Sequence, residues 1–168
     1  MYYDPGDFPF VETLQRNWRV VRDELLRLDP RFMRPWSDRV LCDRGWDVYG
    51  LFAFGSKPLA NCERCPETTR LVEAIPGMMT AGFSILQPNT HIRPHVGYLD
   101  TVLRCHLGLI TPTGCAMRVG TEVRTWGEGE CLIFDDTVEH EVWHKGESPR
   151  AVLLIDFAKL RTAARPAA

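Results

Sequence analysis

The first half of the chain carries two patterns typical of helices. Between residues 10 and 28, apolar side chains recur at spacings of three and four, which places them on one helical face. Asp29-Pro30 should end this helix, because the residue before a proline avoids the helical conformation. A second helix is expected over 66–74, with a proline near its start and Pro76-Gly77 after its end. We expect both helices to pack against a sheet and to take no part in chemistry.

From Ala81 onward the pattern becomes one of short strands. Apolar or alternating runs follow one another, with Gly, Pro, Asn and Asp between them: AGFSIL, TVLRCHLGLI, CAMRV, EVRTW, ECLIF, HEVW and AVLLIDF. Regular short strands separated by turn residues predict a β-sandwich or barrel. Since the helices precede the strands, we expect a mainly β fold, a jelly roll (double-stranded β-helix) buttressed by N-terminal helices.

The chain length favours one domain over residues 1–168. Its helical or irregular part should cover 1–80 and its jelly-roll core 81–158, followed by a frayed tail, RTAARPAA. The segment 31–60 is rich in aromatic residues and contains a short strand-like run, DVYGLFAF. With 45% hydrophobic and 25% charged residues, the chain can bury a core.

Charge and hydropathy narrow the classes of partner. The net charge of −2 provides no basic field for nucleic acid. No apolar run approaches the roughly 20 residues of a membrane span, and MYYDPGDFPF lacks the features of a secretory signal. We therefore expect a cytoplasmic protein without nucleic-acid or membrane partners.

The six cysteines are expected to be reduced thiols, as is usual in a cytosolic protein. Cys62 and Cys65 form a CxxC, but a zinc site needs two further ligands and no second such pair is present. We interpret the pair as packing residues. A redox role is the lesser alternative, because the strand–CxxC–helix context is missing.

The segment from His95 to Arg150 contains the candidate chemistry. It carries His95, His106 and His140 on segments that resemble strands or their edges, with an arginine ten residues after the last of them. Non-haem iron oxygenases hold their metal with two histidines and a carboxylate, the first pair usually written HxD or HxE. Here the carboxylate position is Gly97, which leaves a coordination position for water, a halide or a substrate group.

Several stretches in order resemble one family, the aspartyl/asparaginyl β-hydroxylases, which are Fe(II)- and 2-oxoglutarate-dependent dioxygenases. These stretches are FSILQPNTHIRPHVG (83–97), LRCHLGLITPTGCAMRVG (103–120), RTWGEGECLIFDDTVEHEVW (124–143) and the segment from Arg150 to Asp156. The family typically lacks the facial carboxylate, so Gly97 agrees with the resemblance. The resemblance implies iron(II), 2-oxoglutarate and dioxygen as cofactor and cosubstrates.

The resemblance also implies roles for seven residues. His95 and His140 match the iron ligands, and Asp136 matches an acidic residue near iron-bound water. Arg150, with Ser84 beside it, matches the anchor of the distal carboxylate of 2-oxoglutarate, a group that guanidinium pairs with well. The remaining two, Arg104 and His106, match residues at the other end of the cosubstrate. Being two apart on a strand, they should face the same side.

Each assignment has a structural alternative, since a histidine in a sheet is more often a packed core residue than a metal ligand. We assign only structural roles to two further histidines, with His91 in a loop near the mouth of the site and His144 exposed. Two aromatic residues, Trp126 and Trp143, are interpreted as packing residues.

The substrate is less clearly indicated. Animal peptidyl hydroxylases carry an additional arginine where this chain has Val102, so we favour a small amino acid or a short peptide. Segments 31–60 and 96–101 are expected to shape the pocket. Two alternatives remain open: a radical halogenase that places a halide beside Gly97, and a cupin-like module that binds metal without turnover.

Overall fold

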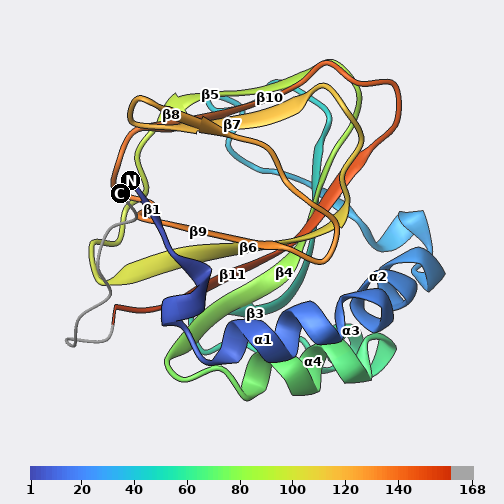
Figure 1. Ribbon diagram of the computed structural model, residues 1–168. Coiled ribbons are helices and arrows are strands. Elements are labelled where there is room, and N and C mark those ends of the chain that lie inside the picture. Colours follow the sequence, from blue (N-terminus) through green and yellow to red (C-terminus); the bar gives the residue numbers. More distant parts are fainter. Residues whose placement is uncertain (160–168) are drawn as a thin grey trace.

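The computed structural model describes residues 1–159, which form two facing antiparallel sheets with helices against the outer side of the larger one (Figure 1). The helices are α1 (Phe10–Arg16), α2 (Trp18–Arg27), α3 (Leu59–Arg64) and α4 (Pro66–Glu73), with short 3-10 turns at Pro5–Asp7 and Pro30–Phe32. The strands are β1 (Tyr2–Tyr3), β2 (Arg34–Pro35), β3 (Trp46–Ala53), β4 (Met78–Leu86), β5 (Thr90–His95), β6 (Val102–Ile110), β7 (Cys115–Val119), β8 (Glu122–Arg124), β9 (Cys131–Phe134), β10 (His140–His144) and β11 (Arg150–Ala158).

The larger sheet has seven strands in the order β1-β9-β6-β11-β4-β3-β2, and the smaller has four in the order β5-β10-β7-β8. From β4 onward, successive strands alternate between the two sheets, with the exception of β7 and β8, and this is the arrangement of a jelly roll (Figure 1). The predicted fold class, mainly β with buttressing helices, is confirmed. The predicted frayed tail, 161–168, lies outside the described residues.

The predicted helix over 10–28 is two helices, with the break at Asn17. The side-chain amide of Asn17 donates to the Thr13 carbonyl at 2.8 Å, and this local bond competes with continuation of the helix. The apolar face nevertheless continues across the break, because Val11, Leu14 and Val21 are all buried. The second predicted helix is confirmed as α4, and α3 before it was not foreseen.

The N-terminal part of the chain supplies strands as well as helices, since β1, β2 and β3 belong to the larger sheet. One strand in the C-terminal part, β5, was absent from the predicted runs, although its last residue, His95, was placed on a segment resembling a strand or its edge; this strand contains Pro94. Proline is tolerated at a sheet edge, and β5 is the edge strand of the smaller sheet. The division of the sequence at residue 80 is therefore not a division of the sheet.

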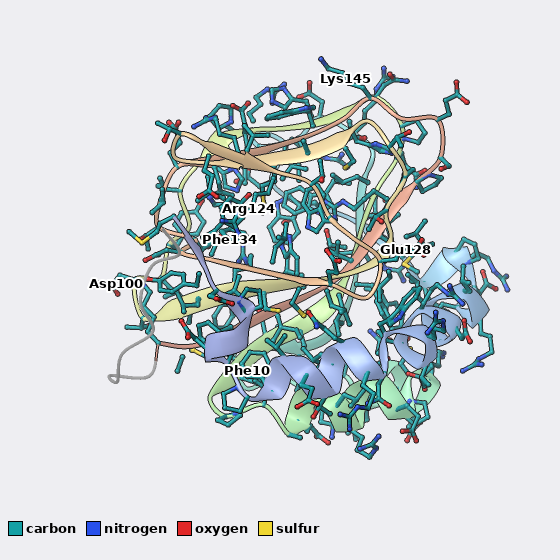
Figure 2. All side chains as sticks on the ribbon, in the orientation of Figure 1. Phe10, Asp100, Arg124, Glu128, Phe134 and Lys145 are labelled. Atoms are coloured by element: carbon teal, nitrogen blue, oxygen red, sulfur yellow. The ribbon has the colours of Figure 1, made fainter. Side chains whose placement is uncertain are left out.

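Side chains of the larger sheet alternate between two faces. On β6, Leu103, Cys105 and Leu107 belong to the cluster that packs against the helices. Phe10 lies in this helix layer, whereas Phe134 points into the space between the sheets (Figure 2).

The six cysteines are all free and buried, and burial raises the pKa of Cys65 to about 12.

A buried carboxylate ties the helices together. Glu24 on α2 accepts hydrogen bonds from the backbone N–H groups of Glu67 and Thr68 at 2.9 and 2.8 Å, and from the Thr68 hydroxyl at 2.6 Å. It thereby satisfies donors at the start of α4, where no side chain of the preceding residue does so.

Within residues 1–159, no helix has both the length and the apolar character of a membrane span.

Candidate metal and anion site between the sheets

His95 and His140 lie side by side on adjacent strands of the smaller sheet. They are paired residues of β5 and β10, and their ring centroids lie 4.2 Å apart. Each Nδ1 lies within hydrogen-bond distance of a backbone carbonyl, that of Arg93 at 2.8 Å and that of Val138 at 2.9 Å. A carbonyl only accepts, so each Nδ1 carries the proton and each Nε2 keeps a free lone pair. This is the tautomer that a metal ligand needs.

Burial keeps the second imidazole neutral. His140 is 3% exposed, and desolvation lowers its pKa to about 4. Within residues 1–159, no group of three or more His, Cys, Asp or Glu side chains is arranged to hold a metal ion. The site therefore presents two imidazole nitrogens rather than a facial triad.

Asp136 occupies the space next to Gly97. The Gly97 N–H donates to the backbone carbonyl of Asp136 at 2.7 Å. A Cβ added at Gly97 would lie 1.7 Å from the Oδ2 of Asp136. The other carboxylate oxygen, Oδ1, lies 3.4 Å from Nε2 of His140. A side chain at position 97 and the observed position of the Asp136 carboxylate are therefore incompatible.

Arg104 is held by two carboxylates. Its Nε and Nη2 donate to the two oxygens of Asp156 at 2.7 and 3.0 Å, and its Nη1 lies 2.5 Å from Oδ1 of Asp136. The Thr80 hydroxyl donates to Asp156 as well, at 2.7 Å. Burial raises the pKa of Asp136, while the neighbouring guanidinium opposes this shift. Arg104 keeps only part of its five N–H donors for any further ligand.

His106 presents an unsatisfied donor to the interior. The indole N–H of Trp126 donates to its Nδ1 at 3.3 Å, which leaves the proton on Nε2. That Nε2 is buried and has no hydrogen-bond partner among the described residues. Desolvation, and then the charges of Arg150 and Arg104, lower the pKa of this histidine. Buried polar atoms are rarely left unpaired, so this donor indicates a position for a ligand acceptor.

Arg150 is a buried cation without a counterion. It is 1% exposed, and within residues 1–159 no Asp or Glu forms an ion pair with it. Its Nη1 donates to the Ser84 carbonyl at 3.4 Å, its Nε has no partner, and the guanidinium lies 4.5 Å from the Trp126 ring. Burying an unpaired charge costs several kcal/mol or more, which indicates that an anion completes this site.

The Ser84 hydroxyl is free to donate a hydrogen bond to a ligand. Its Oγ accepts from the indole N–H of Trp46 at 3.1 Å, so the hydroxyl hydrogen remains available. Ser84 pairs with Val152 on β11, two residues from Arg150, and therefore faces the same side of the larger sheet. A carboxylate near Arg150 would find a guanidinium and a hydroxyl donor together.

The strand register brings the predicted residues to the same interior space. Arg104 pairs with Asp156, and His106 pairs with Leu154, so both side chains face the smaller sheet as predicted. Phe134 packs edge-on against the rings of His106 and His140, at 5.2 and 5.3 Å. The site thus combines two metal-competent imidazoles, a buried cation and an unsatisfied donor.

A cavity of 370 Å³ opens onto the site. Its wall includes Ser84, His95, Arg104 and Asp136, while the buried His106, His140 and Arg150 lie outside the wall. Both segments expected to shape the pocket contribute to it. These contributions are Trp36, Leu41, Trp46, Val48, Tyr49, Gly50, Phe52, Ala53 and Phe54 from the first, and Val96, Gly97 and Tyr98 from the second.

Two residues of the site were missed from the sequence. Trp126, interpreted as a packing residue, orients His106 and covers Arg150. Asp156 holds Arg104, and its signal was available, because it is the only carboxylate in the otherwise apolar run AVLLIDF. The role of Trp126 could not be read from a local pattern, because it depends on contacts of a loop residue with His106 on β6 and Arg150 on β11.

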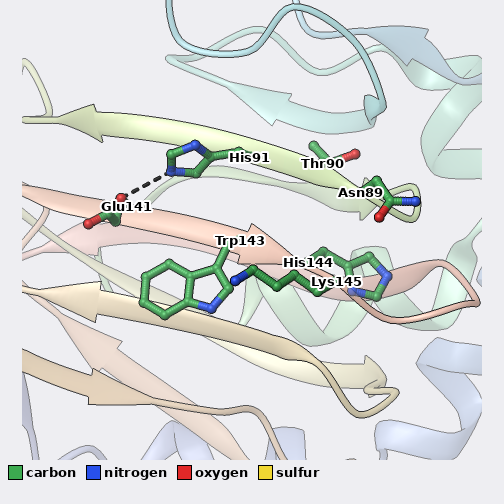
Figure 3. Close-up of a pocket in the computed structure, with 7 residues that line it drawn as sticks. All are labelled: Asn89, Thr90, His91, Glu141, Trp143, His144 and Lys145. Carbon is green, nitrogen blue, oxygen red and sulfur yellow. Dashed lines mark hydrogen bonds and ion pairs between the residues drawn. The ribbon is translucent and has the colours of Figure 1, made fainter.

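A second depression, of 460 Å³, lies on the outer face of the smaller sheet (Figure 3). His91, expected in a loop at the mouth of the site, lies on β5 instead, where its exposed side chain pairs with Glu141 at 3.0 Å. His144 is buried, not exposed as expected. Its Nε2 lies 2.7 Å from the Ser148 carbonyl and its Nδ1 accepts from the Gly146 N–H, which stabilises the turn. Alternation along β10 places Glu141 on the face opposite His140, so this depression is separate from the site.

Comparison with known proteins gives one family match. The family model described as aspartyl/asparaginyl beta-hydroxylase matches residues 15–159. A Rhizobium tropici protein named ornithine lipid ester-linked acyl 2-hydroxylase is 39% identical over 97% of this chain and 62% of its own length. The human protein named aspartyl/asparaginyl beta-hydroxylase is 37% identical over 91% of this chain and 21% of its own length. The chain thus spans only part of these two relatives.

Solved structures share the fold. An oxidoreductase of the 2OG-Fe(II) oxygenase family from Burkholderia pseudomallei has a TM-score of 0.62 at 15% identity, covering 86% of this chain and 80% of its own. A Pseudomonas putida prolyl-4-hydroxylase has a TM-score of 0.56 at 15% identity, covering 89% of this chain and 99% of its own. At such identities the likeness concerns the jelly roll alone.

Proposed function

The chain belongs to the aspartyl/asparaginyl β-hydroxylase family, and we propose that it is an Fe(II)- and 2-oxoglutarate-dependent dioxygenase. The reaction proposed is hydroxylation of an unactivated C–H bond, with an amino acid or an aspartyl- or asparaginyl-type residue of a peptide as the substrate that the sequence favours. The observation that carries the proposal is Arg150, a guanidinium that is 1% exposed and has no acidic partner within residues 1–159.

The residues fit the proposed metal and cosubstrate. His95 and His140 would hold iron(II) through their Nε2 atoms, because their Nδ1 atoms are engaged by backbone carbonyls. Bound iron(II) supplies the activation of dioxygen. Asp136, whose Oδ1 lies 3.4 Å from the Nε2 of His140, is placed to accept hydrogen bonds from water beside the metal.

The protein would bind 2-oxoglutarate through the two carboxylates of this cosubstrate. Arg150 and the Ser84 hydroxyl bind and orient the distal carboxylate, and the Trp126 and Trp46 indoles keep both donors in place. His106 donates its unsatisfied Nε2–H to the other end, together with the N–H groups of Arg104 that Asp156 does not use. Burial of these groups excludes water and strengthens each contact.

The proposal is tested by steady-state kinetics of succinate formation from 2-oxoglutarate. We expect formation to require iron(II), and we expect Arg150→Met to raise the apparent KM for 2-oxoglutarate by about a hundredfold, since loss of one partner of a buried charge pair costs 2–5 kcal/mol. Arg124→Met is the matched control, because Arg124 pairs with Glu122 on the edge strand β8. An unchanged KM in Arg150→Met would contradict the assignment.

The position of the Asp136 carboxylate speaks against the halogenase alternative. That alternative required space for a halide beside Gly97, and the Asp136 carboxylate occupies that space. An anion placed against a carboxylate is repelled, which favours hydroxylation. The mass of the product distinguishes the two, since a gain of one chlorine would contradict the proposal.

The second alternative, a cupin-like module without turnover, is an outcome of the same assay. Succinate formation above the iron-free background, in the presence of any substrate, excludes it. The two separate groups of donors, at Arg150 and at His106, favour a dicarboxylate cosubstrate over a simple metal-binding role.

A further inference from the structure

The first strand of the chain, β1, lies beside a segment that carries two of the candidate site residues. Tyr2 pairs with Phe134 at the end of β9, and the N–H of Asp135 donates to the carbonyl of the residue before Tyr2 at 3.2 Å (Figure 1). Asp136 and His140 follow on the same segment. The family match begins at residue 15, so β1 lies outside it. This strand therefore braces part of the site, and the family match assigns it no role.

The side chain of Tyr2 joins the two sheets. It is fully buried, and its hydroxyl donates to the carbonyl of Met117 on β7 at 3.0 Å. Burial raises the pKa of Tyr2, so the hydroxyl keeps the proton that it donates. Because β1 belongs to the larger sheet and β7 to the smaller one, this hydrogen bond fixes the position of the ring between the sheets.

The ring of Tyr2 is connected to the site through one further ring. Its centroid lies 6.1 Å from that of Phe134, with an angle of 62° between the two planes. Phe134 in turn packs against both buried imidazoles, at 5.2 Å from His106 and 5.3 Å from His140. A close-packed interior has few voids to absorb a displacement, so one side chain transmits it to the next. A loss of volume at Tyr2 should therefore let Phe134 move, and the two imidazoles with it.

The next residue of β1, Tyr3, faces the other way. Alternation along the strand turns its side chain toward the helices, where it packs against Phe8 with ring centroids 6.4 Å apart. Tyr2 belongs to the cluster between the sheets, whereas Tyr3 packs against the helix-side cluster. Two neighbouring tyrosines of one edge strand thus differ in the face of the sheet that they contact.

We propose that Tyr2 is a positioning residue of the site: through Phe134 it holds the imidazoles of His106 and His140 in the orientation that binds metal and 2-oxoglutarate. The inference rests on the proposed function and adds to it a residue outside the family match. Since Tyr2 acts through another side chain, its removal should change the geometry of the site and leave the donor atoms of the site in place.

The proposal is tested by titration with Co(II), whose visible absorption bands report the arrangement of the ligands around the ion. Tyr2→Ala should alter these bands and weaken Co(II) binding about tenfold, the lower end of the 10–100-fold typical for outer partners of a metal ligand, because Tyr2 acts from one side chain further away. Tyr2→Phe keeps the ring and should restore the wild-type bands, with less than about a threefold change in affinity for one lost hydrogen bond. Wild-type bands and affinity in Tyr2→Ala would overturn the proposal.

Two further variants separate positioning from a general loss of stability. Tyr3→Ala is the matched control, and its Co(II) affinity should stay within about twofold of wild type, as for a change that is independent of the site. Tyr2→Leu fills more of the space than alanine, and it should also alter the absorption bands, which keeps the test available if Tyr2→Ala does not fold. All variants are compared below their urea unfolding midpoints. Equal effects of Tyr2→Ala and Tyr3→Ala on Co(II) binding would mean that β1 contributes stability alone.

The route through Phe134 is tested by a double-mutant cycle. If Tyr2 acts on the imidazoles through this ring, adding Tyr2→Ala to a Phe134→Leu protein should cost less Co(II) affinity than adding it to the wild-type protein. An equal cost in both backgrounds would contradict this route.

Turnover of the wild-type protein distinguishes this inference from the proposed function. If the iron-loaded protein forms succinate from 2-oxoglutarate, and Tyr2→Ala matches it in succinate formation and in Co(II) binding, the role of Tyr2 is wrong and the proposed function stands. If Tyr2→Ala alters the Co(II) bands and the wild-type protein forms no succinate, the proposed function fails while Tyr2 still positions the metal ligand.

Discussion

The two faces of the larger sheet are built from neighbouring residues and differ in almost every physical respect. On β6, Leu103, Cys105 and Leu107 pack against the helices, while Arg104 and His106 face the smaller sheet. The helix-side cluster is apolar and closely packed. The opposite face holds buried polar atoms without partners on His106 and Arg150. One face satisfies its polar groups within the fold, and the other leaves polar atoms free for the ligands that we propose it binds.

The same contrast appears in two buried charges. Glu24, beside the helices, is 2% exposed and accepts three hydrogen bonds from Glu67 and Thr68. Arg150, between the sheets, is 1% exposed and has no acidic partner within residues 1–159. A buried charge that the chain itself satisfies supports the fold, whereas a buried charge left unsatisfied marks a binding site.

The largest expected difference between the two faces is in activity. His140→Ala should reduce iron-dependent succinate formation to background, because one of two metal-competent imidazoles is lost. Leu153→Ala, on the helix-side face, should lower the free energy of unfolding by about 2–5 kcal/mol through the cavity it leaves. Turnover per folded molecule in Leu153→Ala should stay close to that of the wild-type protein, as checked by urea unfolding and succinate assays.

The separation of the two faces would be disproved if Leu153→Ala, measured well below its unfolding midpoint, lost turnover as completely as His140→Ala.

A smaller loss of activity is expected from a single methyl group at the site. Gly97→Ala places a Cβ 1.7 Å from the Asp136 carboxylate, so this carboxylate must move. Displacement of a group next to a metal typically costs 10–100-fold in metal affinity or activity, and we expect a loss of about that size. Iron affinity and turnover are the measurements.

The double variant Gly97→Ala/Asp136→Gly is the control for this explanation. It removes the clash, so the loss in the double variant should be smaller than the sum of the two single losses in free energy. Strict additivity would show that Asp136 and position 97 act independently.

The next prediction is an increase in the free energy of unfolding, whereas most substitutions lower it. Arg150→Met should raise the free energy of unfolding of the ligand-free protein by about 1–4 kcal/mol, because an apolar side chain replaces a buried and unpaired cation. Urea unfolding without 2-oxoglutarate measures this change. A destabilised Arg150→Met protein would mean that the contacts of the guanidinium inside the protein already compensate its charge, so that it does not require an anion.

The smallest effect concerns the satisfied charge. Glu24→Gln keeps the size of the side chain but weakens three hydrogen bonds to the start of α4, so we expect a loss of about 1–3 kcal/mol in unfolding free energy. Turnover below the unfolding midpoint should not change. If Glu24→Gln stabilised the protein as Arg150→Met does, the distinction between the two buried charges would be wrong.

Local patterns were sufficient for most of the fold. The apolar periodicity located the helical region, and the alternation of short runs located the strands from β4 onward except β5. The errors lie where a local signal was overridden. Asn17 interrupts a helix whose apolar face continues, and Pro94 is accommodated in β5 only because that strand is at a sheet edge.

The candidate site followed from the sequence through residue types and spacing, with the resemblance to a family supplying the roles. The structure brings the seven named residues to one interior space, and their roles remain the proposal tested above. The sequence alone did not show that Trp126 orients His106, or that Asp156 and Asp136 hold Arg104. These contacts join segments that are far apart in the chain, and no local spacing records them.

The sequence by itself determined which residues can bind a metal or an anion and which faces of the strands they share, because alternation along a strand is a local property. Only the tertiary structure decided which of those groups remain unsatisfied. Arg104 and Arg150 look alike in the sequence, yet the register of β6 with β11 gives Arg104 one carboxylate, Asp156, and the turn after β9 gives it a second, Asp136. Arg150 has none within residues 1–159, and this difference is what points to an anionic ligand.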